Sequence, residues 1–304
     1  MIKVDNISKS FGGTLALDRV SCTVSEGSIY GMIGSNGAGK STFLRVLSGV
    51  YRPDSGSVTV DGEALWNNPS AKGKIMFVPD ELFFLPGANM KRMESLYASL
   101  FPRFDKKRFS ELTEAFRLDP KAQINSFSKG MKRQAATALA LAARPDYLFF
   151  DETFDGLDPI MRHFVKRLIG EDVLDRGTTA VITSHSLREL EDTCDQLAML
   201  HRGGLVLESD IQDLKTDKFK IQVAYREEIG REAFADIDVK HFSRQGSVIN
   251  MIVSGDREKT VEKLKRLDPV LLEVLPMTLE EVFVYELESL GYAYGENDIE
   301  GVLK

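Results

Sequence analysis

Cysteine is scarce in this 304-residue sequence, which contains only Cys22 and Cys194. The two thiols lie far apart and have no neighbouring cluster of metal-ligand residues, which argues against a disulfide-stabilised scaffold and against a cysteine metal site. We therefore expect a reducing, cytoplasmic setting, with both cysteines in or near the core rather than in a catalytic role.

A basic excess is also missing, since the formal net charge is -7 and the isoelectric point is about 5.3. Nucleic-acid-binding proteins generally show a basic patch or stripe, so we expect no nucleic-acid partner. No segment approaches the ~18 consecutive apolar residues of a membrane span, and the residues after Met1 lack a basic-then-apolar signal region. If the protein works at a membrane, we expect a partner to supply the span.

A glycine-rich segment follows the short apolar run Ile29–Ile33, which predicts a strand, and precedes Phe43–Gly49, which keeps helical spacing. The segment matches the phosphate-loop pattern G-x-x-x-x-G-K-[ST] in its expected place. Glycine backbone can wrap its N–H groups around a polyphosphate, and the helix N-terminus adds a favourable dipole. A chance glycine-rich turn would not keep so many positions in register. The candidate phosphate-binding residues are Gly34, Ser35, Asn36, Gly37, Ala38, Gly39, Lys40, Ser41 and Thr42.

Two of these side chains have distinct chemical roles. Lys40 is expected to reach the β- and γ-phosphates of a nucleotide as a point charge, and the Ser41 hydroxyl is expected to bind Mg²⁺. The helix that begins here places its partly positive end against the same anion. Loop, dipole and lysine therefore predict a site for a nucleoside triphosphate and Mg²⁺.

Two further apolar runs predict buried strands of a parallel sheet, and each ends in polar residues. Tyr147–Phe150 leads into Asp151 and Glu152, and Thr179–Thr183 leads towards His185. Ligands of open parallel sheets gather at the carboxyl ends of the strands, so these residues are expected near the phosphate loop. Asp151 suits Mg²⁺ coordination, Glu152 suits activation of a water for attack on the γ-phosphate, and His185 is expected to contact that phosphate. Alternatively, the acids solvate a strand end and the histidine is an ordinary hydrogen-bonding residue.

Residues 82 to about 135 change character and predict a helical subdomain inserted into the α/β fold, with helical spacing over Met90–Phe101 and Lys107–Phe116. Aromatic residues at such spacing usually face inward, although a docking surface for a partner helix is the alternative. The aromatic residues concerned are Phe83, Phe84, Tyr97 and Phe104.

A long buried helix is expected after Ser128, over the alanine- and leucine-rich run Ala135–Ala143. Ser128 has the residue type of a helix N-cap. A cap does not explain Gly130, which is a poor helix former in the first turn. We expect another group to approach the backbone of Gly130 closely.

Near the N-terminus, Phe11 lies in a turn between two short β-like runs, residues 2–7 and 20–25. Its ring is a candidate platform for an adenine base. The alternative, an aromatic side chain packed under a hairpin, is equally compatible with this residue alone.

In this order, the motifs resemble those of the ATP-binding subunits of ABC (ATP-binding cassette) transporters, over about residues 1–215. The resemblance implies an α/β P-loop cassette that binds and hydrolyses ATP with Mg²⁺, with Phe11 stacked on adenine, Asp151 and Glu152 as the acidic pair and His185 as the switch histidine. It places Asp80, within Val78–Glu81, at the glutamine-loop position that senses Mg²⁺ and contacts the membrane subunit. An acid stands there instead of the usual glutamine.

The resemblance also assigns a signature motif to Phe127–Met131, in which Ser128 and Gly130 match and Lys129 replaces a glycine. It implies that this segment contacts the γ-phosphate held by a second ATPase subunit, and that Gly156–Asp158 form the loop known in the family as the D-loop. Lys129 either adds a charge contact to that phosphate or is simply solvated. A helix N-terminus that has no anion in its own chain is consistent with such pairing.

The implied assembly is a head-to-tail pair of ATPases, identical or different, that works on a separate transmembrane permease at the cytoplasmic face of a bacterial membrane. Closing and reopening the pair would drive the permease. The alternative is a non-transport ATPase of the same superfamily, acting as a regulatory or nucleic-acid-associated factor. Translation factors of that kind carry two cassettes and chromosome ATPases a long coiled coil, and neither pattern occurs here.

Residues 216–304 predict a small ferredoxin-like α+β domain, from a β-α-β-β-α-β order followed by a closing helix. Its last part, from Leu275 to Phe283, resembles the C-terminal extension of ATPase subunits from exporters of antibiotics and of bacitracin-like or amphipathic peptides. The domain either contributes a dimer or regulatory contact or is a passive cap. The predicted elements are strand Phe219–Tyr225, helix Glu227–Ala235, strands Val239–Phe242 and Ser247–Val253, helix Arg257–Leu267, strand Val270–Val274 and helix Leu279–Glu288.

Overall fold

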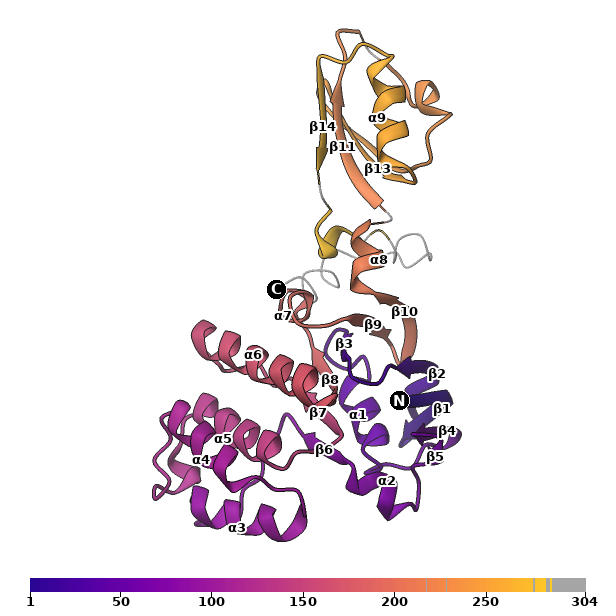
Figure 1. The fold of residues 1–304 in the computed structure, drawn as a ribbon. Coiled ribbons are helices and arrows are strands. Elements are labelled where there is room, and N and C mark those ends of the chain that lie inside the picture. Colours follow the sequence, from indigo (N-terminus) through magenta and orange to yellow (C-terminus); the bar gives the residue numbers. More distant parts are fainter. Residues whose placement is uncertain (217, 228, 276, 283–284, 286–304) are drawn as a thin grey trace. The chain divides into compact units, whose positions relative to one another are not determined.

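The chain divides into two compact units, Met1–Glu208 and a second unit that begins at Ser209 (Figure 1). The boundary between the units precedes residue 215, where the sequence analysis ends the first domain. Among the described residues, no helix has both the length and the apolar character that a membrane crossing requires. The structure is a computed structural model, and it describes residues 1–216, 218–227, 229–275, 277–282 and 285.

The first unit contains a four-stranded antiparallel sheet in the order β2-β1-β4-β5. Along β1, Ile2 and Val4 are buried while Lys3 and Asp5 face outward, as alternation predicts for a sheet with one covered face. Its strands are β1 (Ile2–Phe11), β2 (Thr14–Val24), β4 (Ser55–Val60) and β5 (Glu63–Ala64).

A six-stranded sheet in the order β10-β9-β3-β8-β7-β6 forms the centre of this unit. Strand β3 pairs in parallel with β8 and β9, and β7 pairs in parallel with β6 and β8. The carboxyl ends of these strands therefore lie along one edge of the sheet. The phosphate loop, the pair Asp151 and Glu152, and His185 lie at or directly after the ends of β3, β7 and β8 there. The strands are β3 (Ile29–Ile33), β6 (Ile75–Val78), β7 (Tyr147–Asp151), β8 (Thr179–Ser184), β9 (Gln196–His201) and β10 (Gly204–Asp210).

Helix α1 (Lys40–Leu47) packs between the two sheets, since it contacts both β2 and β7. Its apolar residues Phe43, Leu44 and Leu47 are fully buried in a core cluster that takes residues from both sheets. This burial fixes the helix, and with it the loop that precedes it. The other helices beside the sheets are α2 (Pro69–Gly73), α6 (Pro159–Arg176) and α7 (Leu187–Glu191).

A helical part follows β6 in the chain and lies together at one end of this unit (Figure 1). Three of its helices are capped, because the side chains of Asn89, Asp105 and Ser128 each accept a backbone hydrogen bond, and the cap at Ser128 is the one that the sequence predicted. Its elements are α3 (Met90–Leu100), α4 (Lys106–Ala115), the 3₁₀ turn η1 (Ile124–Ser126) and α5 (Lys129–Ala142).

The aromatic residues of this part divide between the two alternatives that the sequence left open. Phe84 is buried, whereas Phe83 is 78% exposed. The ring of Tyr97 lies 6.5 Å from that of Phe104, and both side chains are half-buried. Tyr97 and Phe104 therefore pack within the helical part, and Phe83 alone faces solvent.

The second unit contains an antiparallel sheet in the order β12-β13-β11-β14, with β11 between β13 and β14. Phe219 and Ile221 of β11 pack with Ile249 and Met251 of β13 in a separate hydrophobic core. The elements are α8 (Ile211–Thr216), β11 (Lys218–Ala224), the 3₁₀ turn η2 (Arg231–Phe234), β12 (Val239–Gln245), β13 (Val248–Ser254), α9 (Arg257–Lys265) and β14 (Leu271–Leu275).

One predicted helix of this unit is wrong. Among the described residues of the segment expected to be helical over Glu227–Ala235, the helical element is the short turn η2. Gly230 stands before that turn with extended backbone, at ψ 172°, and glycine gains no stability from a helical conformation there. The helix expected over Leu279–Glu288 is present at residues 279–282, and most of its remainder lies outside the described residues.

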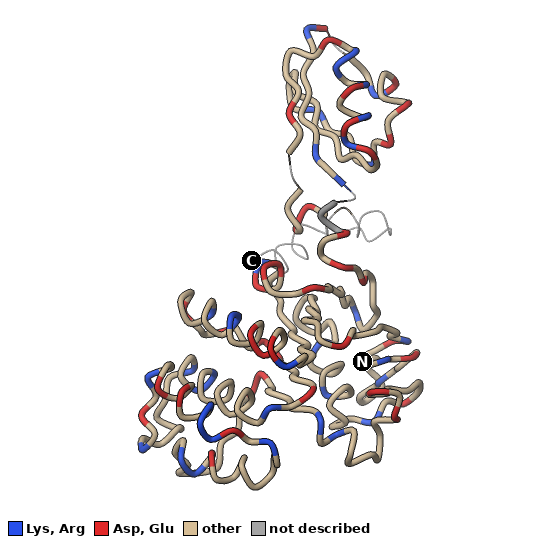
Figure 2. The backbone as a smooth tube through the Cα atoms, viewed as in Figure 1, with Lys and Arg blue, Asp and Glu red and all other residues tan. Residues whose placement is uncertain are grey.

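Basic and acidic residues are interspersed over both units (Figure 2). This distribution accompanies the formal net charge of -7.

Candidate active site

The glycine-rich loop between β3 and α1 is seated directly on neighbouring backbone. A Cβ atom at Gly34 would lie 2.4 Å from the carbonyl oxygen of Leu200, and one at Gly39 would lie 2.5 Å from that of Ala16. Gly37, at φ +81°, has nothing within 4 Å of the position of a Cβ. Gly34 and Gly39 therefore allow the loop to pack closely against neighbouring backbone, and Gly37 allows the positive φ angle in the uncovered part of the loop.

The rest of the loop leads into the first turn of α1. The amide of Ala38 donates to the carbonyl oxygen of Ser35 at 3.1 Å, which closes a turn around the exposed Asn36. Ala38 itself is buried, while Ser41 and Thr42 are half-buried in the first helical turn. The backbone N–H groups at this helix start have no carbonyl partners within the helix and can bind an anion.

Lys40 is buried and joins the loop to the end of β7. Its Nζ donates to the carbonyl oxygen of Gly34 at 2.6 Å and lies 3.2 Å from Oε1 of Glu152. In the chain alone, the lysine predicted to bind phosphate is thus neutralised by the predicted general base.

Glu152 is held from two sides. Its Oε2 lies 2.8 Å from Nδ1 of His185 and accepts the backbone N–H of the same residue at 3.3 Å. Its backbone has φ +49°, a left-handed conformation that is uncommon for a residue with a side chain. The structure therefore brings together three residues that are far apart in the sequence, Lys40, Glu152 and His185, with the carboxylate in the middle.

Asp151, the neighbour of Glu152, is fully buried. Its Oδ1 accepts a hydrogen bond from Oγ1 of Thr183 at 2.7 Å, whereas Oδ2 has no hydrogen-bond partner among the described residues. A buried carboxylate oxygen without a partner is costly, and a cation would satisfy it. Sequence reasoning missed Thr183, although the parallel pairing of the two predicted strands places it beside Asp151.

Asp80 follows the end of β6, the strand beside β7. Its Oδ1 forms a short ion pair with Nη2 of Arg133, and Nη1 of Arg133 donates to the carbonyl oxygen of Pro79 at 3.1 Å. The arginine side chain is 2% exposed and that of Asp80 is 48% exposed. The sequence analysis missed Arg133, although a charged residue in a helix that is expected to be buried indicates an ion-pair partner.

The first turn of α5 contacts the segment after Glu152. The hydroxyl of Ser128 caps the helix by accepting the N–H of Met131 at 3.2 Å, as predicted. A Cβ at Gly130 would lie 2.7 Å from the carbonyl oxygen of Gly156, so the group that approaches Gly130 belongs to the same chain.

Lys129 also has a partner within the chain. Its Nζ donates to Oδ2 of Asp155 at 2.6 Å, and both side chains are well exposed. This hydrogen bond holds the pKa of the Asp155 carboxyl below its ordinary value, against the smaller opposing effect of desolvation. The pairing could not be read from the sequence, because it depends on the approach of α5 to the Gly156 turn.

Two predicted ligand-binding residues have local partners. Oδ1 of Asp158 accepts the N–H groups of Ile160 and Met161, both at 3.0 Å, and so caps α6. The ring of Phe11 is 42% exposed and packs edge-on against Tyr51, with 5.2 Å between the ring centroids. The Phe11 ring is therefore partly exposed and partly packed, which is compatible both with stacking on adenine and with packing under the hairpin.

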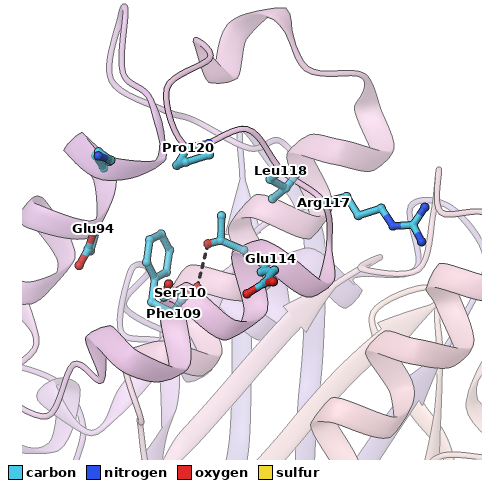
Figure 3. A pocket seen from close by; sticks show the side chains of 9 residues that line it. Glu94, Phe109, Ser110, Glu114, Arg117, Leu118 and Pro120 are labelled. Carbon is cyan, nitrogen blue, oxygen red and sulfur yellow. Dashed lines mark hydrogen bonds between the residues drawn. The ribbon is translucent and has the colours of Figure 1, made fainter.

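A cavity of about 440 Å³ lies within the helical part, between α3, α4 and the loop that follows (Figure 3). None of the predicted site residues lines it. Its lining residues are Lys91, Glu94, Phe109, Ser110, Thr113, Glu114, Arg117, Leu118 and Pro120.

A glycine loop seated before a helix, a buried lysine, a positioned carboxylate and a buried acid with an unpaired oxygen define a phosphate-loop nucleoside triphosphatase. Comparison with known proteins gives the family. The sequence pattern of the family described as "ABC transporter" matches residues 17–155.

The relatives agree with this match. Over 284 residues the chain is 30% identical to the ABC transporter ATP-binding protein YtrB of Bacillus subtilis (strain 168), covering 93% of this chain and 97% of that protein. It is 34% identical over 221 residues to the bacitracin transport ATP-binding protein BcrA of Bacillus licheniformis, covering 71% of each chain. A solved structure of an ATP-binding subunit of an ABC transporter matches with a TM-score of 0.66 and 25% identity, covering 70% of this chain and 91% of that one.

The chain belongs to the ABC transporter ATP-binding proteins. It has the α/β P-loop cassette fold of that family and is an ATPase subunit that binds ATP.

Proposed function

We propose that this subunit powers a bacterial exporter of peptides or of antimicrobial, toxin-like molecules. It pairs with a second ATPase, identical or different, and acts on a separate transmembrane permease at the cytoplasmic face of the cell membrane. Residues 1–215 form the ATPase domain of this proposal, and residues 216–304 form an accessory or regulatory domain.

The observation that carries the hydrolytic part is the contact of Glu152 with both Lys40 and His185. Upon nucleotide binding, Lys40 exchanges the carboxylate for the β- and γ-phosphates, while the loop residues 34–42 surround the phosphates with N–H groups. Glu152, still oriented by His185, then accepts the proton of the attacking water. Phe11 provides a face on which the adenine ring stacks.

Mg²⁺ fits the donor set on the same edge of the sheet. The unpaired Oδ2 of Asp151 and the hydroxyl of Ser41 would hold it, and hard oxygen ligands of this kind suit the ion. When bound, Mg²⁺ neutralises charge that develops on the β- and γ-phosphate oxygens. Thr183 keeps the Asp151 carboxylate in place through its hydrogen bond to Oδ1.

Pairing is proposed to use the start of α5. The N-terminus of this helix, with Ser128, Lys129 and Gly130, would meet the γ-phosphate of the second subunit, and Asp158 would lie beside the same junction. In the chain alone Lys129 is bound to Asp155, so a contact across the pair would replace that ion pair. Loss of the γ-phosphate after hydrolysis would then remove the bridge.

The cargo class rests on the relatives. The bacitracin transport protein named above shares 34% identity over 71% of its length. This similarity is the basis for proposing a peptide antibiotic as the cargo.

Replacement of Glu152 tests the hydrolytic role. The variant Glu152→Gln keeps the phosphate contacts but loses the base, so it should bind Mg-ATP with little change and hydrolyse it at least about 10²-fold more slowly. Binding is measured with a fluorescent ATP analogue, and turnover by phosphate release. Unchanged turnover would reject Glu152 as the base, and loss of binding would point to a structural role.

A further inference from the structure

Arg133 is the largest fully buried side chain among the described residues. Its guanidinium has two partners on consecutive residues, the carbonyl oxygen of Pro79 and the Oδ1 atom of Asp80. A buried guanidinium left without a counter-charge is strongly unfavourable, because desolvation is not repaid. In the described part of the chain, Asp80 is the carboxylate that contacts Arg133 directly. The pKa of the Asp155 carboxyl, lowered chiefly by the hydrogen bond from Lys129, is lowered further by the nearby charge of Arg133.

This ion pair joins two regions that respond to nucleotide under the proposed function. Arg133 lies in the second turn of α5, the helix whose N-terminus Ser128 caps. Asp80 lies two residues past Val78, which pairs in register with Phe150, so it stands at the strand end beside Glu152. One arginine thus connects the edge of the active site to the helical part.

We propose that Arg133 is a positioning residue that fixes Asp80 against α5, so that Asp80 acts as a charged link between the active site and α5 and not as a metal ligand. This inference rests on the proposed ATPase role. In the sequence analysis, the family resemblance implied that Asp80 senses Mg²⁺ and so grouped it with Ser41 and Asp151 as a metal-binding residue.

The reason is the difference in burial between the two partners. A carboxylate that moved to Mg²⁺ would leave a guanidinium that is 2% exposed with one carbonyl oxygen as its remaining hydrogen-bond partner in the part of the chain that the structure describes. The ion has the unpaired Oδ2 of Asp151 on the same edge and needs no second carboxylate, since Mg²⁺ commonly keeps phosphate and water ligands. The carboxylate of Asp80 therefore serves as the ion-pair partner of Arg133 and not as a ligand of Mg²⁺.

A double-mutant cycle in the full chain tests the link, with Asp80→Asn, Arg133→Met and the double variant. Stability is measured by urea unfolding. We expect Asp80→Asn to raise the equilibrium constant for unfolding by about 100-fold or more, because it leaves the buried Arg133 guanidinium without its ion-pair partner. In the double variant this constant should be at least about tenfold lower than in Asp80→Asn. Additive effects of the two substitutions would overturn the ion-pair link.

The metal is tested by the Mg²⁺ concentration that half-saturates binding of a fluorescent ADP analogue. In Asp80→Asn this concentration should stay within about twofold of the unmodified chain, whereas loss of a metal ligand should raise it by about tenfold or more. The larger shift would overturn the proposal and restore Asp80 as a metal-binding residue. Because ADP is not hydrolysed, this readout does not depend on turnover.

A positioning role also predicts an effect on turnover. Under conditions where every variant is folded, Arg133→Met should lower kcat for ATP by about tenfold while the affinity for the ADP analogue changes little. An unchanged kcat would leave Arg133 a structural residue only and overturn its positioning role. The matched control is Arg176→Met, which breaks the 2.7 Å pair with Asp172 on α6 and should lower stability without changing kcat.

The experiments distinguish failure of the proposed function from failure of the link between Asp80 and Arg133. A chain that binds no nucleotide in any form would reject the proposed function. The unfolding cycle would still decide whether Asp80 neutralises Arg133.

Discussion

At the scale of single residues, most side chains of the candidate active site already contact one another in the chain without a ligand. Lys40, Glu152 and His185 form a chain of contacts. One oxygen of Asp151 accepts a hydrogen bond from Thr183, and the other has no hydrogen-bond partner among the described residues. The carboxylate is held in place by a lysine, a histidine and a left-handed backbone. A base that is positioned in advance needs little reorganisation when the substrate binds.

The two cysteines belong to the same scale and are expected to be inert. Cys22 and Cys194 are both buried, and burial raises the pKa of the Cys22 thiol to about 12 and that of Cys194 further from its ordinary value. The reactive thiolate is therefore nearly absent at neutral pH. Ellman's reagent should detect neither thiol in the native chain and both after denaturation. Rapid labelling of the native chain would show that one of the two sites opens.

At the scale of secondary structure elements, the contact between α5 and the Gly156 turn explains a glycine in a helix. We predict that Gly130→Ala lowers stability, because overpacking against the Gly156 carbonyl costs about 1–3 kcal/mol and exceeds the ~1 kcal/mol gain in helix propensity. ATP turnover should fall as well, since the turn that follows Glu152 must move. Thermal unfolding and phosphate release are the two measurements.

Gly170 provides the matched control in α6. A Cβ at Gly170 would have nothing within 4 Å, so Gly170→Ala should raise stability by ~0.5–1 kcal/mol and leave turnover unchanged. Equal thermal shifts for Gly130→Ala and Gly170→Ala would contradict the proposed role of the contact.

The elements also show how far a sequence can be interpreted. The apolar runs that form β7 and β8 predicted that Asp151, Glu152 and His185 lie near one another, because parallel strands present their carboxyl ends together. The partners of Arg133 and Lys129 could not be found in this way, since Asp80 and Asp155 approach them only through the docking of α5. The helix expected over Glu227–Ala235 was wrong because the extended Gly230 was treated as an ordinary helical position.

At the scale of the whole molecule, the proposed pairing gives a direct measurement. Because Glu152→Gln should hydrolyse ATP slowly, we expect this chain to keep its bound ATP. Size exclusion with light scattering should then give twice the monomer mass in Mg-ATP and the monomer mass without nucleotide. A chain that stays monomeric in ATP would indicate that pairing needs the permease or a different ATPase.

Lys129 distinguishes the two roles left open for it in the pair. In the Glu152→Gln chain, Lys129→Ala should leave nucleotide binding nearly intact but weaken pairing, if the lysine exchanges Asp155 for the phosphate of the second subunit. Asp155→Ala is the matched variant, because it frees the lysine without removing its charge and should leave pairing at least as strong. Equal pairing in all three chains would make Lys129 a solvated residue.

The contact between Lys40 and Glu152 has a kinetic consequence. If Lys40 exchanges the carboxylate for phosphate as proposed, nucleotide association should be an exchange of partners in two steps and not a simple collision. The observed rate of binding in a stopped-flow experiment should then level off at high ATP concentration, at the rate of the internal release. In Glu152→Gln, where the competing charge is gone, the same rate should keep rising in proportion to ATP.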